Sequence, residues 1–259
     1  MITRPGEMEA VAARLVEKRR GVIMTGAGIS VASGVPDFRS AGGLWARFDP
    51  MEYATIEAFR TNPVKVWRML REMDEIIHRA VPNPAHLAVA ELEKLGLVMG
   101  LITQNVDNLH QRAGSREVVE FHGNAERLVC PECGWSGSAA GFRQEGRQQT
   151  PPRCPECGMI LKPDVVFFGE QISPLASSRA MNLVQSCETM LVIGTSAMVA
   201  PASYLPVVAR KSGAQVVEIN RERTVLTGEV AHVSLLGDAS EILSALVDLV
   251  RRPAASGNP

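Results

Sequence analysis

The sequence has 259 residues, 46% of them hydrophobic, and a formal net charge of -1. A chain of this length can bury a full core, and it fits one large domain that carries a smaller one. The near-zero charge argues against nucleic acid as a partner, because proteins that bind phosphate backbones usually carry a basic excess. The chain contains neither a signal-peptide-like start nor an uncharged run of roughly 18 residues, so we expect a cytoplasmic protein without membrane contact.

Predicted strands and helices alternate along the chain. Short apolar runs predict buried strands at residues 22–25, 98–103, 118–121, 165–168, 190–194, 215–220 and 232–236. Helical spacing of apolar residues predicts helices at residues 7–20, 85–95, 175–187, 202–212 and 240–251. Such alternation is typical of an α/β fold, in which helices cover both faces of a parallel sheet. Two stretches, residues 36–84 and 123–164, break the pattern, and we expect them to be insertions near strand ends.

The first predicted strand leads into a glycine-rich turn, GAGISVASG, at residues 26–34. Glycines directly after a strand allow a tight turn and the close approach of a pyrophosphate. Val31 stands where the third glycine of the dehydrogenase fingerprint belongs, which disfavours a standard hydride-transfer fold, and similar turns occur in loops that bind nothing. An acid, an aromatic ring and a guanidinium follow in Asp37, Phe38 and Arg39. By themselves these three also fit a surface ion pair beside a packed ring.

Polar side chains follow the strand at residues 98–103, and they are Gln104, Asn105 and Asp107. Open α/β sheets bind ligands at the carboxyl ends of their strands, so this end of the strand predicts a ligand site. His122 comes after the next strand, and an imidazole with an ordinary pKa near 6.5 suits a general base. A lone histidine at a strand end is more often structural, and we interpret His86 and His110 as structural.

Four of the five cysteines form two C-x-x-C pairs, Cys130 with Cys133 and Cys154 with Cys157. A glycine follows each pair and lets the turn close so that the sulfurs converge. Two such pairs supply the four thiolates of a tetrahedral structural zinc site, with no open position for catalysis. The alternative is a redox pair or a chance pattern, although a redox motif needs only one pair. Cys187 follows helical apolar spacing and is interpreted as a packing residue.

These motifs occur together in the order found in one family. They are GAGIS, PDFRS, TQNVDNLHQRAG, FHGN, the two C-x-x-C pairs, KPDVVFFGE, GTS at residues 194–196, and Asn220. On these motifs the chain resembles the prokaryotic-type sirtuins (Sir2 family), NAD-dependent protein deacylases, from Gly26 to about Ala239.

The resemblance implies a Rossmann-like NAD-binding domain at residues 1–35, 85–122 and 165–252. It implies a smaller domain formed by two insertions, a cofactor loop with a helical module at residues 36–84 and a zinc-binding module at residues 123–164. We expect residues 253–259 to be a disordered tail.

The resemblance also implies which residues bind the co-substrate. NAD contacts are implied for Gly26, Ala27, Gly28, Ser30, Asp37, Phe38, Arg39, Trp45, Gln104, Asn105, Val106, Asp107, Gly194, Thr195, Ser196, Asn220, Arg221, Glu222 and Ala239. The implied catalytic residues are His122, Asn105 and Asp107. His122 would act on the ribose hydroxyls as general base, so that the 2′-oxygen attacks an O-alkyl imidate. The implied products are nicotinamide, deacylated lysine and 2′-O-acyl-ADP-ribose, and the implied metal is structural zinc.

The implied substrates are acyl-lysine proteins or peptides. In sirtuins the segment at Val165, Val166, Phe167, Phe168 and Gly169 pairs with the substrate backbone as an added strand, which favours broad specificity; an ordinary buried strand is the other interpretation. Sirtuins that prefer acidic acyl groups carry a Tyr-x-x-Arg pair where alignment on Asn62-Pro63 places Leu70 and Met73. We therefore predict neutral acyl groups, acetyl first, with longer chains as an alternative, and a monomer or weak oligomer.

Two rival functions stay open at this point. The same cleft could transfer ADP-ribose to a protein side chain. The chain could also be a non-enzymatic interaction module, with a zinc ribbon on a nucleotide-binding scaffold.

Overall fold

The fold is described by a computed structural model covering residues 6–37, 43–141 and 150–252. Its larger part is built on a six-stranded parallel sheet with the order β3-β2-β1-β7-β8-β9. The strands are β1 Gly21–Thr25, β2 Val98–Thr103, β3 Val118–Glu120, β7 Thr189–Ile193, β8 Gln215–Asn220 and β9 Val233–Leu236. Counted within this sheet the order is 3-2-1-4-5-6, the order of dinucleotide-binding folds.

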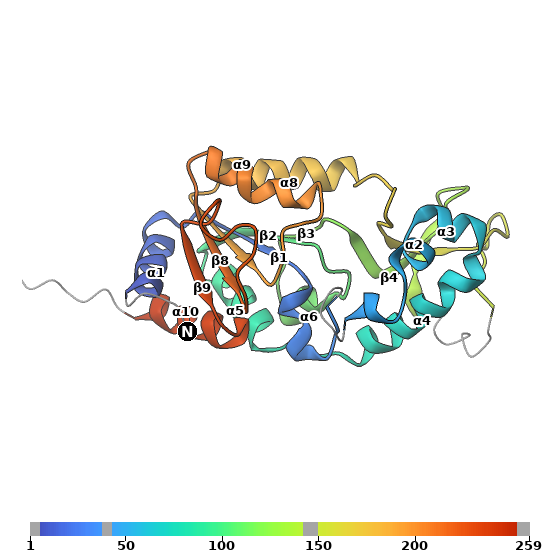
Figure 1. The fold of residues 1–259 in the computed structure, drawn as a ribbon, viewed down its shortest axis with the longest axis horizontal. Coiled ribbons are helices and arrows are strands. Elements are labelled where there is room, and N and C mark those ends of the chain that lie inside the picture. Colours follow the sequence, from blue (N-terminus) through green and yellow to red (C-terminus); the bar gives the residue numbers. More distant parts are fainter. Residues whose placement is uncertain (1–5, 38–42, 142–149, 253–259) are drawn as a thin grey trace, which may run out of the picture.

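Helices cover both faces of this sheet, as the alternating pattern predicts (Figure 1). On one face lie α1 Glu7–Lys18, α5 Pro84–Lys94 and α10 Ala239–Arg251, and on the other lie α8 Pro174–Ser186 and α9 Leu205–Lys211. Successive residues of a strand point to opposite faces. In β1, Ile23 joins the core under the first group of helices, whereas Val22 and Met24 join the core under the second. Burial on both faces explains why every residue of β1 is buried.

The smaller part combines helices with a second sheet. The helices are α2 Pro50–Tyr53, α3 Ile56–Thr61 and α4 Pro63–Arg79, and the antiparallel sheet has the order β5-β4-β6, from Ser136–Ser138, Gly123–Val129 and Lys162–Val165. One core joins them, with Trp67 of α4 packed among Leu128, Leu161 and Phe167. The Trp67 indole Nε1 also donates to the Leu161 carbonyl at 2.9 Å. The two inserted segments therefore fold against each other.

Caps and short turns fix the remaining elements. Asn62 caps α4 by accepting from the Lys65 N–H at 3.0 Å, and Pro63 occupies the first turn. The short elements are the 3₁₀ turns η1 Ala27–Ile29, η2 Val31–Ser33, η3 Leu44–Ala46 and η4 Ala202–Tyr204, and helix α6 Leu109–Ala113. The helix predicted at residues 202–212 is thus split between η4 and α9, with Pro206 in the first turn of α9. Within the described ranges, none of the helices is long and apolar enough to cross a membrane.

The prediction of a strand at residues 165–168 within the parallel sheet is wrong. Strand β6 spans Lys162–Val165 and pairs with β4 in the small sheet, not with the parallel sheet. Beyond it, Phe168 forms an isolated bridge with Thr55. The run is apolar and β-branched enough for a strand, but its backbone partners are His122, Gly123 and the segment at residues 54–56. The predicted tail, residues 253–259, lies outside the described residues.

Candidate functional site

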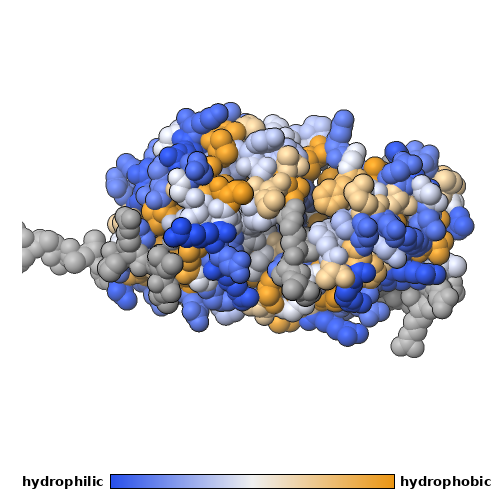
Figure 2. All heavy atoms as spheres, viewed as in Figure 1, coloured by the Kyte–Doolittle hydropathy of each residue, from blue (hydrophilic) through white to orange (hydrophobic). Residues whose placement is uncertain are grey.

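A cleft of about 2110 Å³ lies where the two parts of the molecule adjoin. Its walls come from the carboxyl ends of β1, β2, β7 and β8 on one side and from α4 and the segment after β6 on the other. Hydrophobic atoms gather near this junction in the space-filling view (Figure 2). The cleft therefore lies at the sheet edge where parallel α/β folds bind ligands.

The glycine turn after β1 forms one end of the cleft and packs tightly against the turn after β7. The Gly28 N–H donates to the Gly194 carbonyl at 2.8 Å. A Cβ on Gly28 would lie 2.8 Å from the Gly194 Cα, and one on Gly194, whose φ is +60°, would lie 2.4 Å from the Ile29 nitrogen. Glycine is therefore required at both positions by contact between two strand ends, before any ligand is considered. The first helical turns that follow are η1 and η2, not a regular α-helix.

The polar residues after β2 join a buried hydrogen-bond network. Gln104 Nε2 donates to Thr195 Oγ1 at 3.0 Å, and Asn105 Nδ2 donates to the Gly26 carbonyl at 3.2 Å and to Ser30 Oγ at 3.1 Å. Ser30 Oγ in turn donates to Asp107 Oδ2 at 2.7 Å. Gln104 and Asn105 line the cleft, whereas Ser30 and Asp107 lie directly behind its wall. Burial raises the pKa of Asp107, although the Ser30 hydroxyl acts in the opposite direction.

His122 lines the cleft and lies in the turn between β3 and β4. Its Nδ1 lies 3.1 Å from the Gln104 carbonyl oxygen. A carbonyl can only accept, so Nδ1 carries the proton and Nε2 holds the lone pair of the neutral ring. Burial lowers the pKa of His122, and the Gln104 carbonyl offsets part of this shift. The imidazole is thus neutral at pH 7 and its tautomer is fixed by the backbone, which is the state a general base requires.

His86 and His110 lie behind the cleft wall as a buried pair, with ring centroids 4.8 Å apart. His86 Nε2 lies 3.3 Å from Ser30 Oγ, and His110 Nε2 lies 2.9 Å from Thr25 Oγ1. Burial lowers the pKa of His86 to about 4 and that of His110 well below its ordinary value. Both rings are therefore neutral supports of the polar network. The sequence contained no signal for this pairing, because the two helices that carry the rings meet only in the fold.

The turns after β7 and β8 form the other end of the cleft. The predicted residues that line it are Gly194, Thr195, Ser196, Asn220, Arg221, Glu222 and Ala239. Asn220 Nδ2 donates to the Thr195 carbonyl at 2.9 Å, which ties the two turns together. Segments 198–201 and 223–225 also line this end and were not predicted, although both follow strand ends. Buried Glu218 holds the second of these segments by accepting from the Thr224 hydroxyl at 2.5 Å.

The remaining predicted ligand-binding residues line the same cleft, with two exceptions. Ala27, Asp37, Trp45, Val106, Leu70, Met73 and Val165 to Gly169 all border it. Phe38 and Arg39 lie outside the described residues. Arg71 borders the cleft as well, but its guanidinium donates to the Thr150 carbonyl. Leu70 and Met73 themselves offer apolar surface to the cleft, although charged residues of the same helix, Asp74 and Arg79 among them, also border it.

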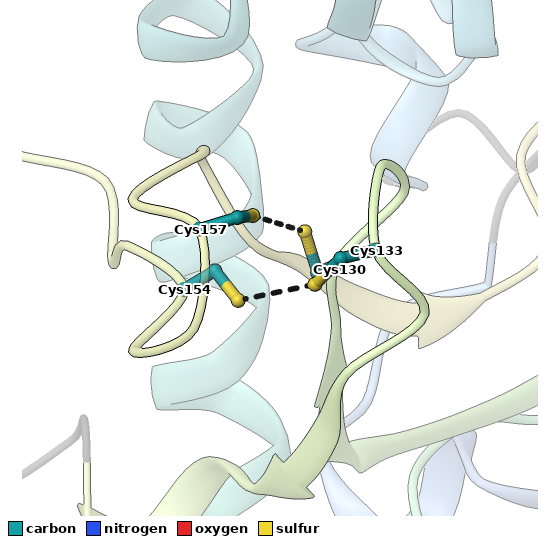
Figure 3. A group of neighbouring side chains, drawn as sticks. All are labelled: Cys130, Cys133, Cys154 and Cys157. Carbon is teal, nitrogen blue, oxygen red and sulfur yellow. Dashed lines mark hydrogen bonds between the residues drawn. The ribbon is translucent and has the colours of Figure 1, made fainter.

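The four paired cysteines converge from two matching turns, with their sulfurs pointing toward one another (Figure 3). The Sγ atoms of Cys130 and Cys157 lie 3.5 Å apart, as do those of Cys133 and Cys154, and all four lie within 4.8 Å. Four sulfurs around zinc at about 2.3 Å are separated by about 3.8 Å, so the group fits a tetrahedral ion. None of the four cysteines lines the cleft, which agrees with a structural role. Cys187 is buried in the sheet core.

Gly134 and Gly158 close the two turns. Both have positive φ, at +75° and +74°, and their N–H groups donate to the carbonyls of Cys130 and Cys154. The N–H groups of Cys133 and Glu132 lower the pKa of the Cys130 thiol to about 7, whereas burial and the neighbouring sulfurs raise the pKa of Cys133 and Cys157. Both glycines thus do what the sequence predicts for them.

A dinucleotide-type sheet, a cleft at its strand ends and a four-cysteine module together define a nucleotide-binding protein with a structural zinc module. The profile of the Sir2 family matches residues 26–201, so the chain belongs to this family. A "NAD-dependent protein deacylase 2" from Pyrobaculum aerophilum is 48% identical over 242 residues, which cover 93% of this chain and 95% of that protein.

Solved structures agree with this assignment. A crystal structure of a Sir2 homologue in complex with NAD has a TM-score of 0.87 and 42% identity, and the match covers 94% of this chain and 93% of that one. A mutant Sir2 homologue in complex with 2′-O-acetyl ADP-ribose also has a TM-score of 0.87 and 42% identity, covering 94% of this chain and 96% of that one.

Proposed function

We propose that this protein removes acyl groups from protein lysines in an NAD-dependent reaction. The products would be nicotinamide, deacylated lysine and 2′-O-acyl-ADP-ribose. The observation that carries this proposal is the position of His122, a neutral imidazole that lines the cleft between Gln104 at the end of β2 and the segment after β6. The deacylase activity of the relative from Pyrobaculum and the ligands of the two solved structures support the same reaction.

We assign the pyrophosphate of NAD to the turn at Gly26 and Gly28, and the adenosine half to the turns after β7 and β8. Arg39 and Phe38, predicted to act on the ribose and to shield the site, complete this assignment. At the nicotinamide end, both N–H groups of the Asn105 amide donate to protein oxygens, so its Oδ1 is directed to accept from the carboxamide. Asp107 supports this end through Ser30, which makes it a positioning residue in the present geometry.

NAD supplies a ribose carbon that becomes electrophilic as nicotinamide leaves. The amide oxygen of an acyl-lysine is a weak nucleophile, so the protein must hold it against this carbon and keep water out. His122 Nε2 then accepts the proton of a ribose hydroxyl, and the freed oxygen attacks the acyl carbon. The bond from this carbon to the lysine nitrogen breaks, the lysine leaves as the amine, and one water consumed after this attack supplies the remaining oxygen of the ester. Because burial lowers the pKa of His122, its ring is unprotonated at neutral pH and can accept the proton.

The acyl-lysine would enter on the side of the segment at Val165 to Gly169, which follows β6 and borders the cleft. Main-chain pairing with such a segment tolerates many sequences, so broad peptide specificity is expected. Leu70 and the half-buried Met73 would face the acyl group and offer no cation to an acidic chain. We therefore propose neutral acyl groups, with acetyl first, and the adaptable Met73 side chain leaves room for longer ones.

Zinc would be held by Cys130, Cys133, Cys154 and Cys157, and it would act on stability alone. Metal binding in such a module supplies folding free energy. In the reducing cytoplasm that we predict for this protein, the four thiols stay available to the ion.

The test is to incubate the protein with NAD and a panel of acyl-lysine peptides and to identify the products by mass. We expect nicotinamide release that requires the acyl group, and loss of the acyl mass from the peptide. A gain of ADP-ribose mass on the peptide would instead indicate ADP-ribosyl transfer. No turnover of NAD under any condition would favour a non-enzymatic interaction module.

A further inference from the structure

Lys162, at the start of β6 in the small sheet, has a buried ammonium group. Only 8% of its side chain is exposed. Its Nζ donates to the Val165 carbonyl at 2.7 Å and to the Pro163 carbonyl at 3.2 Å, and lies 3.2 Å from Glu170 Oε2. An ammonium has three N–H donors, and these three oxygens can take all of them. The ammonium also lies 4.8 Å from the centre of the Phe167 ring, within cation–π range.

Glu170 bonds to the backbone of the same chain segment, residues 163–169, from its C-terminal end. Its Oε2 accepts from the Phe167 N–H at 2.8 Å as well as pairing with Lys162. The two charged residues thus bond from both ends to the backbone of residues 163–169, the segment that we call the arch. Both charges lie on residues that the proposed chemistry does not use, although Glu170 borders the cleft.

The arch is joined to the rest of the molecule by its main chain. The Val166 N–H donates to the His122 carbonyl at 2.9 Å. Two residues on, the Phe168 N–H donates to the Ala54 carbonyl at 2.9 Å, and the Phe168 carbonyl accepts from the Ile56 N–H at 3.0 Å. The shape of the arch therefore decides where an extended peptide backbone would lie relative to His122.

We propose that Lys162 and Glu170 are positioning residues for the acyl-lysine substrate, acting through the backbone of residues 163–169. This inference rests on the proposed function. The two buried charges point to a role other than stability, because a buried ion pair seldom stabilises a protein more than apolar residues of similar volume. What an apolar pair cannot supply is a set of directed bonds to the backbone at the end of β6, where the chain leaves the small sheet and enters the wall of the cleft.

The test is Lys162→Met, which keeps the length of the side chain and removes the ammonium. We expect the KM for the acyl peptide to rise about tenfold or more, the range for losing hydrogen bonds to a charged group. The KM for NAD should change less than about twofold, since the NAD side of the cleft is untouched. Lys65→Met is the matched control, because the Lys65 ammonium also pairs with a glutamate, Glu52, and lies 4.8 Å from the Tyr53 ring, but it forms no hydrogen bond or ion pair with the described residues 163–169.

Glu170 provides a second, independent variant pair. Glu170→Ala removes the ion pair and the acceptor for Phe167, and should raise the peptide KM. Glu170→Gln retains an oxygen acceptor and should recover most of the lost affinity. If Lys162→Met does not fold, the comparison of Glu170→Ala with Glu170→Gln tests the proposal in its place.

The proposal is overturned if Lys162→Met changes the peptide KM no more than Lys65→Met does. It is also overturned if the KM values for peptide and NAD rise together, or if Glu170→Gln is as impaired as Glu170→Ala. A wild-type protein that fails to consume acyl peptide overturns the proposed function itself, and this is seen before any variant is compared.

Discussion

His122→Asn is the substitution that isolates the proposed general base. The Asn amide nitrogen can occupy the place of Nδ1 and still donate to the Gln104 carbonyl, which Nδ1 contacts at 3.1 Å. Only Nε2, the atom that would take the proton, is lost. The change should therefore leave the fold and the backbone contact intact while removing the chemistry.

The expected loss follows from the role. A positioned general base contributes about 10²- to 10⁴-fold, which corresponds to roughly 3 to 5 kcal/mol of transition-state stabilisation. The pH dependence gives a second signature. Because burial lowers the pKa of His122, the wild-type ring becomes protonated only below pH 6.5, so kcat/KM should fall as the pH drops below that value. The variant should have lost this dependence.

The assay is the rate of acyl-ADP-ribose formation from pH 5 to 8. His232→Asn is the matched control: its Nδ1 also contacts the backbone, accepting from the Val216 N–H at 3.0 Å, but it lies at the start of β9 and away from the cleft. Its activity should match the wild type. His122 is not the general base if His122→Asn keeps more than about a tenth of the activity. The same conclusion follows if the kcat/KM of the variant still falls at low pH as that of the wild type does.

Three further changes test the remaining assignments. Cys154→Ser should release zinc and lower the melting temperature sharply, whereas Cys187→Ser, which alters a buried thiol outside the cluster, should keep its zinc; metal analysis that finds zinc retained in both would refute the four-sulfur site. His86 should make stability depend on pH. Below pH 6.5 the unfolded chain binds a proton at His86, whereas the folded protein, in which the His86 pKa is about 4, does not bind it until the pH is lower. The free energy of unfolding should fall by about 3 kcal/mol for this group from pH 6.5 to 4, and denaturant unfolding of His86→Gln should show a shallower decline than the wild type. The wild type should deacetylate faster than it desuccinylates, and Leu70→Tyr with Met73→Arg should shift that ratio toward succinyl; a wild type that prefers the succinylated peptide would show that the apolar wall does not select the acyl group.

The parallel sheet could be predicted because its signal is local. Strand β2 was expected at residues 98–103 and has those bounds, since a strand buried on both faces is a continuous apolar run. The polar residues at its end could also be recognised in the sequence. Because carboxyl ends of parallel strands share one edge, the positions of Gln104 and Asn105 followed from the pattern alone.

Other features depend on partners far along the chain, and no local pattern contains them. Residues 165–168 look like a sheet strand, yet Phe168 pairs with the segment at Ala54 and Ile56. Gly28 suggested a phosphate loop, but its contact with Gly194 already requires a glycine. The pairing of Lys162 with Glu170 was not visible either, since a charged residue at a strand start is usually exposed.

The most direct test of the proposed reaction follows the acyl group itself. A peptide carrying an isotopically labelled acetyl-lysine is incubated with NAD and the protein, and the first nucleotide product is identified by mass. We expect the label on ADP-ribose, with one nicotinamide released for each acetyl group transferred. Label that appears first as free acetate, or that stays on a peptide bearing ADP-ribose, would contradict acyl transfer in this cleft.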